Sequence, residues 1–174
     1  MSAGAVIDSL EFARSEQQLR GSLPVADLQR LDDILFDTQG NLDYVLRGTR
    51  DARNRPQIVV KVEGRLHLQC QRCLGLLDHG VRVQSTLVVL PAGVLPDEDL
   101  DDPEGPDVIE AKPELEVAAL VEDEVLLSLP LAPRHAEGEC EGRLEKQDNA
   151  AEAPSPFAQL AALKRPRRRN QGIT

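Results

Sequence analysis

Strict alternation of apolar and polar side chains over residues 60–70 is the feature that most constrains what this chain can fold into. The apolar side chains share one parity and the polar ones share the other: Val60, Val62, Leu66, Leu68 and Cys70 against Lys61, Glu63, Arg65, His67 and Gln69. A period of two residues is typical of a β-strand with one buried face and one wet face. Residues 42–48 and 78–90 alternate similarly, so the sequence predicts an antiparallel meander of strands at 42–48, 56–70 and 78–90.

Apolar residues at helical spacing flank this meander on both sides. Leu28, Leu31 and Leu35 fall at i, i+3 and i+7, which predicts a helix over 24–36. After the meander, apolar residues at the same kind of spacing predict a second helix over about 114–128. Helices beside an antiparallel sheet are typical of the α+β class.

These elements predict a single α+β domain over residues 1–143. Its antiparallel meander can curl into a barrel-like sheet, with one helix before it and one after it. Short strands are expected at 7–12 and 18–23, ahead of the first helix. The sequence turns low in complexity over residues 145–156, and over residues 144–174 we expect a linker, a short helix and a disordered basic tail.

Residues 91–113 interrupt the pattern with five prolines and a block of acidic side chains. Eight acidic residues and no basic residue lie between Asp97 and Glu110. Because like charges repel one another and stay hydrated, the sequence predicts a mobile acidic loop over 91–113. A docking surface for a basic partner is the alternative interpretation.

Composition narrows the classes of function. The chain carries 30 acidic and 20 basic side chains, a formal net charge of -10, and only 2% aromatic residues. Base-stacking platforms use surface aromatics and extended phosphate-binding surfaces need clustered Lys and Arg, so both are disfavoured. No apolar run approaches the length of a membrane span and the N-terminus has no signal-peptide pattern. We therefore expect a cytoplasmic protein with reduced thiols and no membrane contact.

All three cysteines and one histidine have the spacing of metal ligands. Cys70 and Cys73 form a Cys-x2-Cys pair between two predicted strands, and His135 and Cys140 form a His-x4-Cys pair after the second helix. Two thiolates from one tight turn and a second short-spaced pair match the four ligands of a structural zinc ion. The sequence therefore predicts a zinc site at Cys70, Cys73, His135 and Cys140.

Two other interpretations of the cysteines stay open. They are ordinary reduced thiols, or Cys70 and Cys73 are a redox dithiol. The redox interpretation is the weaker, because redox pairs use a helix N-terminus to lower a thiol pKa and a strand follows this pair. His79 is a substitute ligand for His135, whereas His67 is expected to be solvated on the polar face of its strand.

Catalytic patterns are missing from the sequence. It contains no Ser nucleophile elbow, no phosphate-cradling Gly-rich loop and no His-Glu-x-x-His motif. The acidic run 122–124 on the second helix is interpreted as a solvated helix face. We therefore expect a protein that is not an enzyme.

The C-terminus reverses the sign of the charge. Five basic residues occupy six consecutive positions: Lys164, Arg165, Arg167, Arg168 and Arg169. Without them the chain holds 15 basic against 30 acidic residues, a net charge of about -15. An acidic body with a basic arm is typical of proteins that contact nucleic acid through the arm, so these residues are candidates for RNA contact. A solubilising tail is the alternative.

Two motifs in combination point to a known family. The first is Cys70-Gln-Arg-Cys-Leu74 after the alternating strand, and the second is Leu120-Val-Glu-Asp-Glu-Val-Leu-Leu-Ser-Leu-Pro130, followed by His135 and Cys140. Together they resemble the YceD family, the large ribosomal RNA subunit accumulation proteins, over about residues 6–163. The resemblance implies motif or partner-binding roles, beside the cysteines, for Gln71, Arg72, Glu122 and Pro130.

The resemblance implies a bacterial, cytoplasmic ribosome-biogenesis factor without catalysis, which supports the synthesis, processing or stability of 23S ribosomal RNA. Its partner would be a large-subunit ribosomal protein or an rRNA-maturation factor, and direct contact with rRNA stays open. A zinc-stapled protein-interaction module unrelated to ribosomes is the alternative function. The basic tail is not part of the resemblance.

Overall fold

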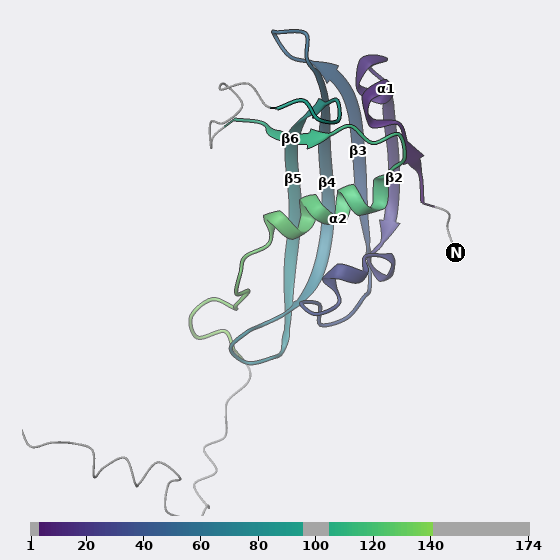
Figure 1. Ribbon diagram of the computed structural model, residues 1–174. Helices are drawn as coiled ribbons and strands as arrows, with labels where there is room; N and C mark the ends of the chain where they lie inside the picture. The colour runs from purple at the N-terminus through teal and green to yellow at the C-terminus, as the bar shows by residue number, and fades with distance from the viewer. Residues whose placement is uncertain (1–3, 96–104, 141–174) are drawn as a thin grey trace, which may run out of the picture. The chain divides into compact units, whose positions relative to one another are not determined.

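An open β-sheet of five strands is the centre of the fold (Figure 1). In this computed structural model residues 4–95 and 105–140 are described, and all of them belong to one compact unit, Met1–Gly142. The strands lie in the order β2-β3-β4-β5-β6 and span these residues: β2 Gln18–Pro24, β3 Asn41–Arg50, β4 Pro56–Gln69, β5 Leu76–Leu90 and β6 Asp107–Glu110.

The predicted antiparallel meander is confirmed in β3, β4 and β5. Tyr44 pairs with Val62, and Val62 pairs with Val83, so the apolar parity of all three strands falls on one face. The side chains of that face, such as Leu46 and Ile58, are buried. Because a slip of one residue would turn every apolar side chain to water, the alternation also fixes the register.

The sheet stays open and does not curl into a barrel. In the described part of the chain β2 and β6 are its two edges, and β6 pairs with β5 in parallel over only four residues. A barrel requires pairing that continues around the whole sheet. The observed fold is therefore α+β with an open, mixed sheet.

The segment predicted as a mobile acidic loop, residues 91–113, contains the strand β6. Its two central residues, Val108 and Ile109, are partly buried, and Ile109 packs against the hydrophobic core. This short apolar pair adds to the edge of β5 although an acid stands on each side of it, at Asp107 and Glu110. Residues 96–104, with the other six acids of the block, lie outside the described residues.

The helix predicted over 24–36 is absent, and two short 3-10 turns, Val25–Asp27 and Gln29–Leu31, stand in its place. The three leucines of the predicted helical face are nonetheless buried. Side chains at i and i+3 also line up in 3-10 turns, so leucine spacing alone does not separate the two structures. The end of the segment bonds to β4 instead of continuing as a helix: Phe36 N donates to His67 O at 2.7 Å.

Residues 7–12, predicted as a strand, lie mostly in the helix α1, Ser9–Arg14. Asp8 caps this helix, because its carboxylate accepts a hydrogen bond from Glu11 N at 2.8 Å. The helix buries Phe12 against the sheet. The strand predicted at 18–23 is confirmed as β2.

The helix predicted over 114–128 is confirmed as α2, Val117–Ser128. It begins three residues late because Leu115–Glu116 form a strand, β7, that pairs with β1, Val6–Ile7. No helix in the described part of the chain is long and apolar enough to cross a bilayer.

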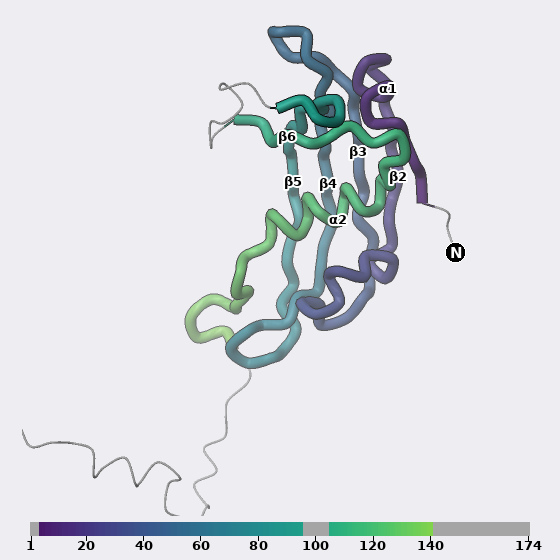
Figure 2. The backbone as a smooth tube through the Cα atoms, in the orientation of Figure 1, coloured from purple at the N-terminus to yellow at the C-terminus, as the bar shows by residue number. Residues whose placement is uncertain are grey.

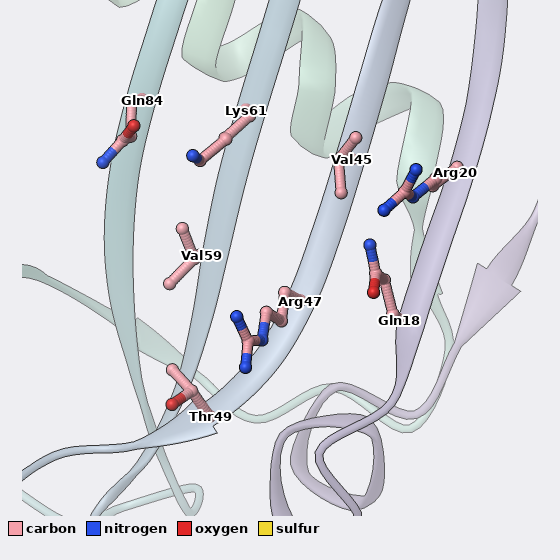
Figure 3. Close-up of a pocket in the computed structure, with 8 residues that line it drawn as sticks. All are labelled: Gln18, Arg20, Val45, Arg47, Thr49, Val59, Lys61 and Gln84. Atoms are coloured by element: carbon pink, nitrogen blue, oxygen red, sulfur yellow. The ribbon is translucent and has the colours of Figure 1, made fainter.

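The helices of the described residues lie on the apolar face of the sheet, where α2 crosses β4 and β5 (Figure 1). The opposite face carries the outward-pointing parity of the strands, and no described helix covers it (Figure 3). The protein therefore has one packed face and one bare face.

Candidate metal centre

The connection between β4 and β5 brings two thiols together. Cys70 follows β4 directly and is fully buried. A tight turn returns the chain: Leu74 N donates to Cys70 O at 2.8 Å, and Cys70 N donates to Gly75 O at 3.0 Å. Leu74 takes a left-handed conformation with φ of 59°, which L-residues adopt rarely. This turn folds Cys73 back toward Cys70.

The segment that follows α2, residues 129–140, supplies the other two predicted ligands. Figure 2 shows it running down to the β4–β5 turn, where the two segments lie side by side. Gln71 N donates to Pro133 O at 2.8 Å and ties them together. His135 and Cys140 thereby reach the turn from 60 or more residues further along the chain.

The four predicted ligands converge at distances that suit one metal ion. Their ligand atoms all lie within 4.8 Å of one another. Cys70 Sγ is 3.8 Å from Cys140 Sγ, and His135 Nδ1 is 3.4 Å from Cys73 Sγ and 3.6 Å from Cys140 Sγ. A tetrahedral zinc ion with its usual bond lengths separates two sulfurs by about 3.8 Å and a sulfur from a nitrogen by about 3.5 Å. The residues present therefore fit zinc.

His135 is oriented for coordination by its other nitrogen. Its Nε2 lies 2.8 Å from the Leu76 carbonyl oxygen, to which it donates when Nδ1 is the unprotonated nitrogen. Metal-ligating histidines commonly hold their second ring nitrogen in this way, because the hydrogen bond fixes both tautomer and ring direction. The same bond raises the pKa of His135.

The turn also stabilises a thiolate. Burial raises the pKa of Cys70, but the backbone N–H groups of Cys73, Arg72 and His135 outweigh burial and bring this pKa down to about 5. A thiolate is the form that binds metal. Cys70 is therefore ready to bind zinc at neutral pH without first losing a proton.

The motif residues between the two cysteines differ in their surroundings. The Arg72 guanidinium faces the site: its Nε lies 3.0 Å from Cys140 Sγ, and its Nη2 donates to Ala136 O at 3.2 Å. The Gln71 side chain is exposed, and its backbone N–H bonds the second segment. Nothing in the spacing of the sequence indicates the contact between Arg72 and Cys140, which arises only where the two segments meet.

One prediction about the acidic helix needs correction. The run 122–124 is not a solvated face, because Glu122 and Glu124 are each only 7% exposed. Glu122 accepts a hydrogen bond from Arg30 N at 2.7 Å, so it fastens α2 to the 3-10 turns. Asp123 pairs with the Arg30 guanidinium. Pro130, exposed beyond the end of α2, keeps an accessible surface.

The remaining predicted residues lie apart from the cluster. His67 is not free in solvent: its Nδ1 lies 2.9 Å from the Asp37 carboxylate. That carboxyl has a lowered pKa, chiefly through the backbone N–H of Gln39 and further through His67. His79 lies on β5 outside the group of four. The basic residues 164–169 lie outside the described residues.

Comparisons with known proteins give the same family as the two motifs. The family model described as Large ribosomal RNA subunit accumulation protein YceD matches residues 58–164. The Large ribosomal RNA subunit accumulation protein YceD of Haemophilus influenzae is 28% identical over 174 aligned residues, which cover 91% of this chain and 94% of that protein. No solved structure matches the chain. The matched region holds the β4–β5 turn, α2 and all four clustered residues.

Proposed function

Because this chain belongs to the YceD family, we propose that it is a cytoplasmic, non-enzymatic ribosome-biogenesis factor. It supports the synthesis, processing or stability of 23S rRNA, and it acts through protein partners. The observation that carries this proposal is the family match over residues 58–164, which includes the motif turn and the acidic helix. The family is named for an accumulation factor, and its name refers to no reaction.

Zinc is part of this proposal as a structural element. Cys70, Cys73, His135 and Cys140 would hold it, and the bound ion would supply four bonds that join the β4–β5 turn to the segment after α2. That segment contains no helix or strand between residues 131 and 140, and outside the cluster Gln71 and Arg72 hold it to the turn by hydrogen bonds. The staple gives the protein a fixed surface at this end of the sheet.

The charge pattern suggests the partners. A body of about -15 outside the basic tail favours a basic partner, such as a large-subunit ribosomal protein or an rRNA-maturation factor. The acidic block around 97–110 steers such a partner, and the basic residues 164–169 contact rRNA. We place residues 1–143 in one domain and 144–174 in a linker, a short helix and this basic tail.

Deletion of the gene tests the cellular role. We expect the ratio of 23S to 16S rRNA to fall, and a plasmid copy of the intact gene to restore it. An unchanged ratio contradicts the proposal. Purification of the tagged protein distinguishes the alternative, since a zinc-stapled module unrelated to ribosomes would recover no ribosomal particles or maturation factors.

Elemental analysis tests the zinc site. Protein purified without chelator should carry about one zinc ion per chain, and Cys73→Ser should lose most of it because a tetrahedral structural site needs all four ligands. His79→Ala, a neighbour outside the cluster, should keep the full amount. If the wild-type protein contains no metal, the structural zinc site is wrong. The ribosomal role is not affected by this result, because the gene deletion tests it separately.

A further inference from the structure

The bare face of the sheet carries basic side chains in adjoining rows. Strand register places Arg20, Val45, Lys61 and Gln84 side by side across β2, β3, β4 and β5. The next row places Arg47 on β3 between Gln18 on β2 and Val59 on β4. Figure 3 shows these side chains on the face opposite α2. They line a shallow depression of about 510 Å³.

No acid lies among the eight residues that line this depression: Gln18, Arg20, Val45, Arg47, Thr49, Val59, Lys61 and Gln84. We call Arg20, Arg47 and Lys61 the basic strip. None of the three forms an ion pair with another described residue, whereas Arg65 in the same sheet pairs with Asp78 at 2.7 Å. In a chain of net charge -10, this strip is a local reversal of sign with its charges turned to solvent.

Acidic residues mark where the strip ends. In the row beyond Lys61, the strand register places Asp43 on β3 opposite Glu63 on β4, and Glu63 opposite Arg82 on β5. Both carboxylates repel a polyanion. An anionic ligand is therefore confined to the two or three rows around Arg47 and Lys61.

We propose that the basic strip binds the phosphate backbone of double-helical RNA. Guanidinium groups match phosphate oxygens in geometry and charge, and Thr49 and the two glutamines add hydrogen-bond donors for phosphate or ribose hydroxyls. RNA is the polyanion named in the family description, so this inference rests on the proposed function and adds to it a direct contact and its place.

The form of the RNA follows from the aromatic residues. Proteins that bind single strands stack the bases on exposed aromatic rings. No aromatic side chain lines the depression: Phe12 and Tyr44 are buried, and Phe36, which is exposed, lies after the 3-10 turns and outside it. Duplex RNA offers phosphates and ribose hydroxyls without needing a stacking partner.

An acidic protein segment fits this face less well. Protein interfaces draw most of their affinity from apolar or aromatic anchors in pockets. Here Val45 and Val59 are the only apolar side chains that line the depression, and both are flush with the strands and partly buried. The face supplies charge and hydrogen bonds, which suit a phosphate backbone.

The energetics predict weak and strongly salt-dependent binding. Three phosphate contacts to a duplex contribute a factor of about 40 to the loss of affinity between about 50 and about 200 mM salt. The acidic side chains that border the strip, such as Asp43 and Glu63, repel RNA, so the strip also favours one orientation of the duplex on this face.

The test is fluorescence anisotropy of the full-length protein with a labelled RNA hairpin over a range of potassium chloride concentrations. The triple variant Arg20→Gln, Arg47→Gln, Lys61→Gln should bind at least about tenfold more weakly at low salt, and its salt slope should fall by about 3. A matched variant removes three exposed cations elsewhere: Arg14→Gln, Arg53→Gln, Lys112→Gln. It keeps the same net charge as the first and should retain most of the wild-type affinity and slope.

Equal losses in the two variants would overturn the inference, because net charge and not the strip would then govern binding. Tighter binding to an unpaired RNA than to the hairpin would overturn the choice of duplex RNA. Loss of an acidic protein partner in the strip variant, with hairpin binding intact, would assign the face to that partner instead. All three outcomes leave the proposed function standing, since that fails only when gene deletion leaves the 23S to 16S ratio unchanged.

Discussion

Among single residues, Arg72 contacts the candidate metal centre without being one of its ligands. Burial raises the pKa of Cys140, and the neighbouring Arg72 charge acts in the opposite direction. The same arginine donates to Ala136 O, so it holds the backbone of the second segment as well as the sulfur. We infer that Arg72 positions Cys140 for metal binding.

Replacement of Arg72 by glutamine tests this role. Arg72→Gln should still bind about one zinc ion, because all four ligands remain. It should release zinc to a chelator about 10-fold faster or more, since outer-shell partners typically change metal affinity by this order. Release is followed with a chromophoric chelator. Arg82→Gln, which removes the same charge from β5, should release zinc at the wild-type rate, and equal rates for both variants would contradict the role.

Residue spacing predicted the ligand cluster but not its surroundings. Cys-x2-Cys and His-x4-Cys are local patterns, so the sequence alone brings Cys70, Cys73, His135 and Cys140 forward as a set. The burial of Glu122 depends on a contact with Arg30, 92 residues away. No local pattern encodes a contact of that kind, and an acidic run on a helix looks the same whether it faces water or the core.

Among the elements, the strands were more predictable than the short helices. Strict alternation over β4 has one structural solution, whereas leucines spaced by three fit both an α-helix and the 3-10 turns at Val25–Asp27 and Gln29–Leu31. β6 was missed because four residues between prolines are too short to show a period. The packing of α1 on β3 depends on a glycine, since a Cβ on Gly48 would lie 2.3 Å from Phe12 O.

Gly48→Ala should therefore destabilise the protein by about 1–3 kcal/mol, because the added methyl group must push α1 away from the sheet. Urea unfolding followed by circular dichroism measures the difference. Gly80→Ala on β5 is the matched control, because a Cβ there meets nothing within 4 Å. We expect the control to change stability by about 0.5 kcal/mol or less. A similar loss in both variants would show that strand glycines, and not the α1 contact, cause the effect.

In the whole molecule, the two faces of the sheet differ: one is packed against the helices, and the other is bare and polar. The packed face holds the core and joins α2 to the sheet, and the candidate metal centre lies at the end where β4 returns into β5. The α+β class follows from the sequence, because periodicity identifies strands and the long helix separately. The sequence does not show that the sheet stays open, because this depends on how β2 and β6 are placed at its two edges.

Acid should weaken the binding of zinc, because protons compete with the metal ion for the same ligand atoms. In the metal-free protein the bond to the Leu76 carbonyl raises the pKa of His135 above 6.5. Below that raised pKa the metal-free protein holds a proton on His135, and zinc must displace this proton to bind. As the pH rises through the pKa the proton is lost and no longer opposes zinc binding. Cys70, with its pKa of about 5, stays a thiolate over this range.

Zinc must displace a proton from Cys140, whose pKa is raised by burial, so we expect zinc affinity to fall with acidification over the whole range. The fall should become steeper below the raised pKa of His135, where a second ligand is also protonated. Competition with a chelator of known affinity, between about pH 6 and about pH 8, measures the change. His79→Ala should follow the wild-type profile. A pH profile that does not become steeper toward pH 6 would mean that His135 does not bind the metal.

The short length of β6 leaves most of its neighbour's outer edge open. β6 pairs only with Leu87–Leu90, so in the described part of the chain the stretch of β5 from Leu77 to Thr86 has no strand beyond it. A strand edge that is not paired with a neighbour is a template for a strand of another chain. The exposed charges of Asp78 and Arg82 disfavour the pairing of this edge with a flat, apolar strand. Self-association at high concentration would begin along this margin, and an extended segment of matching charge could lengthen the sheet by one strand.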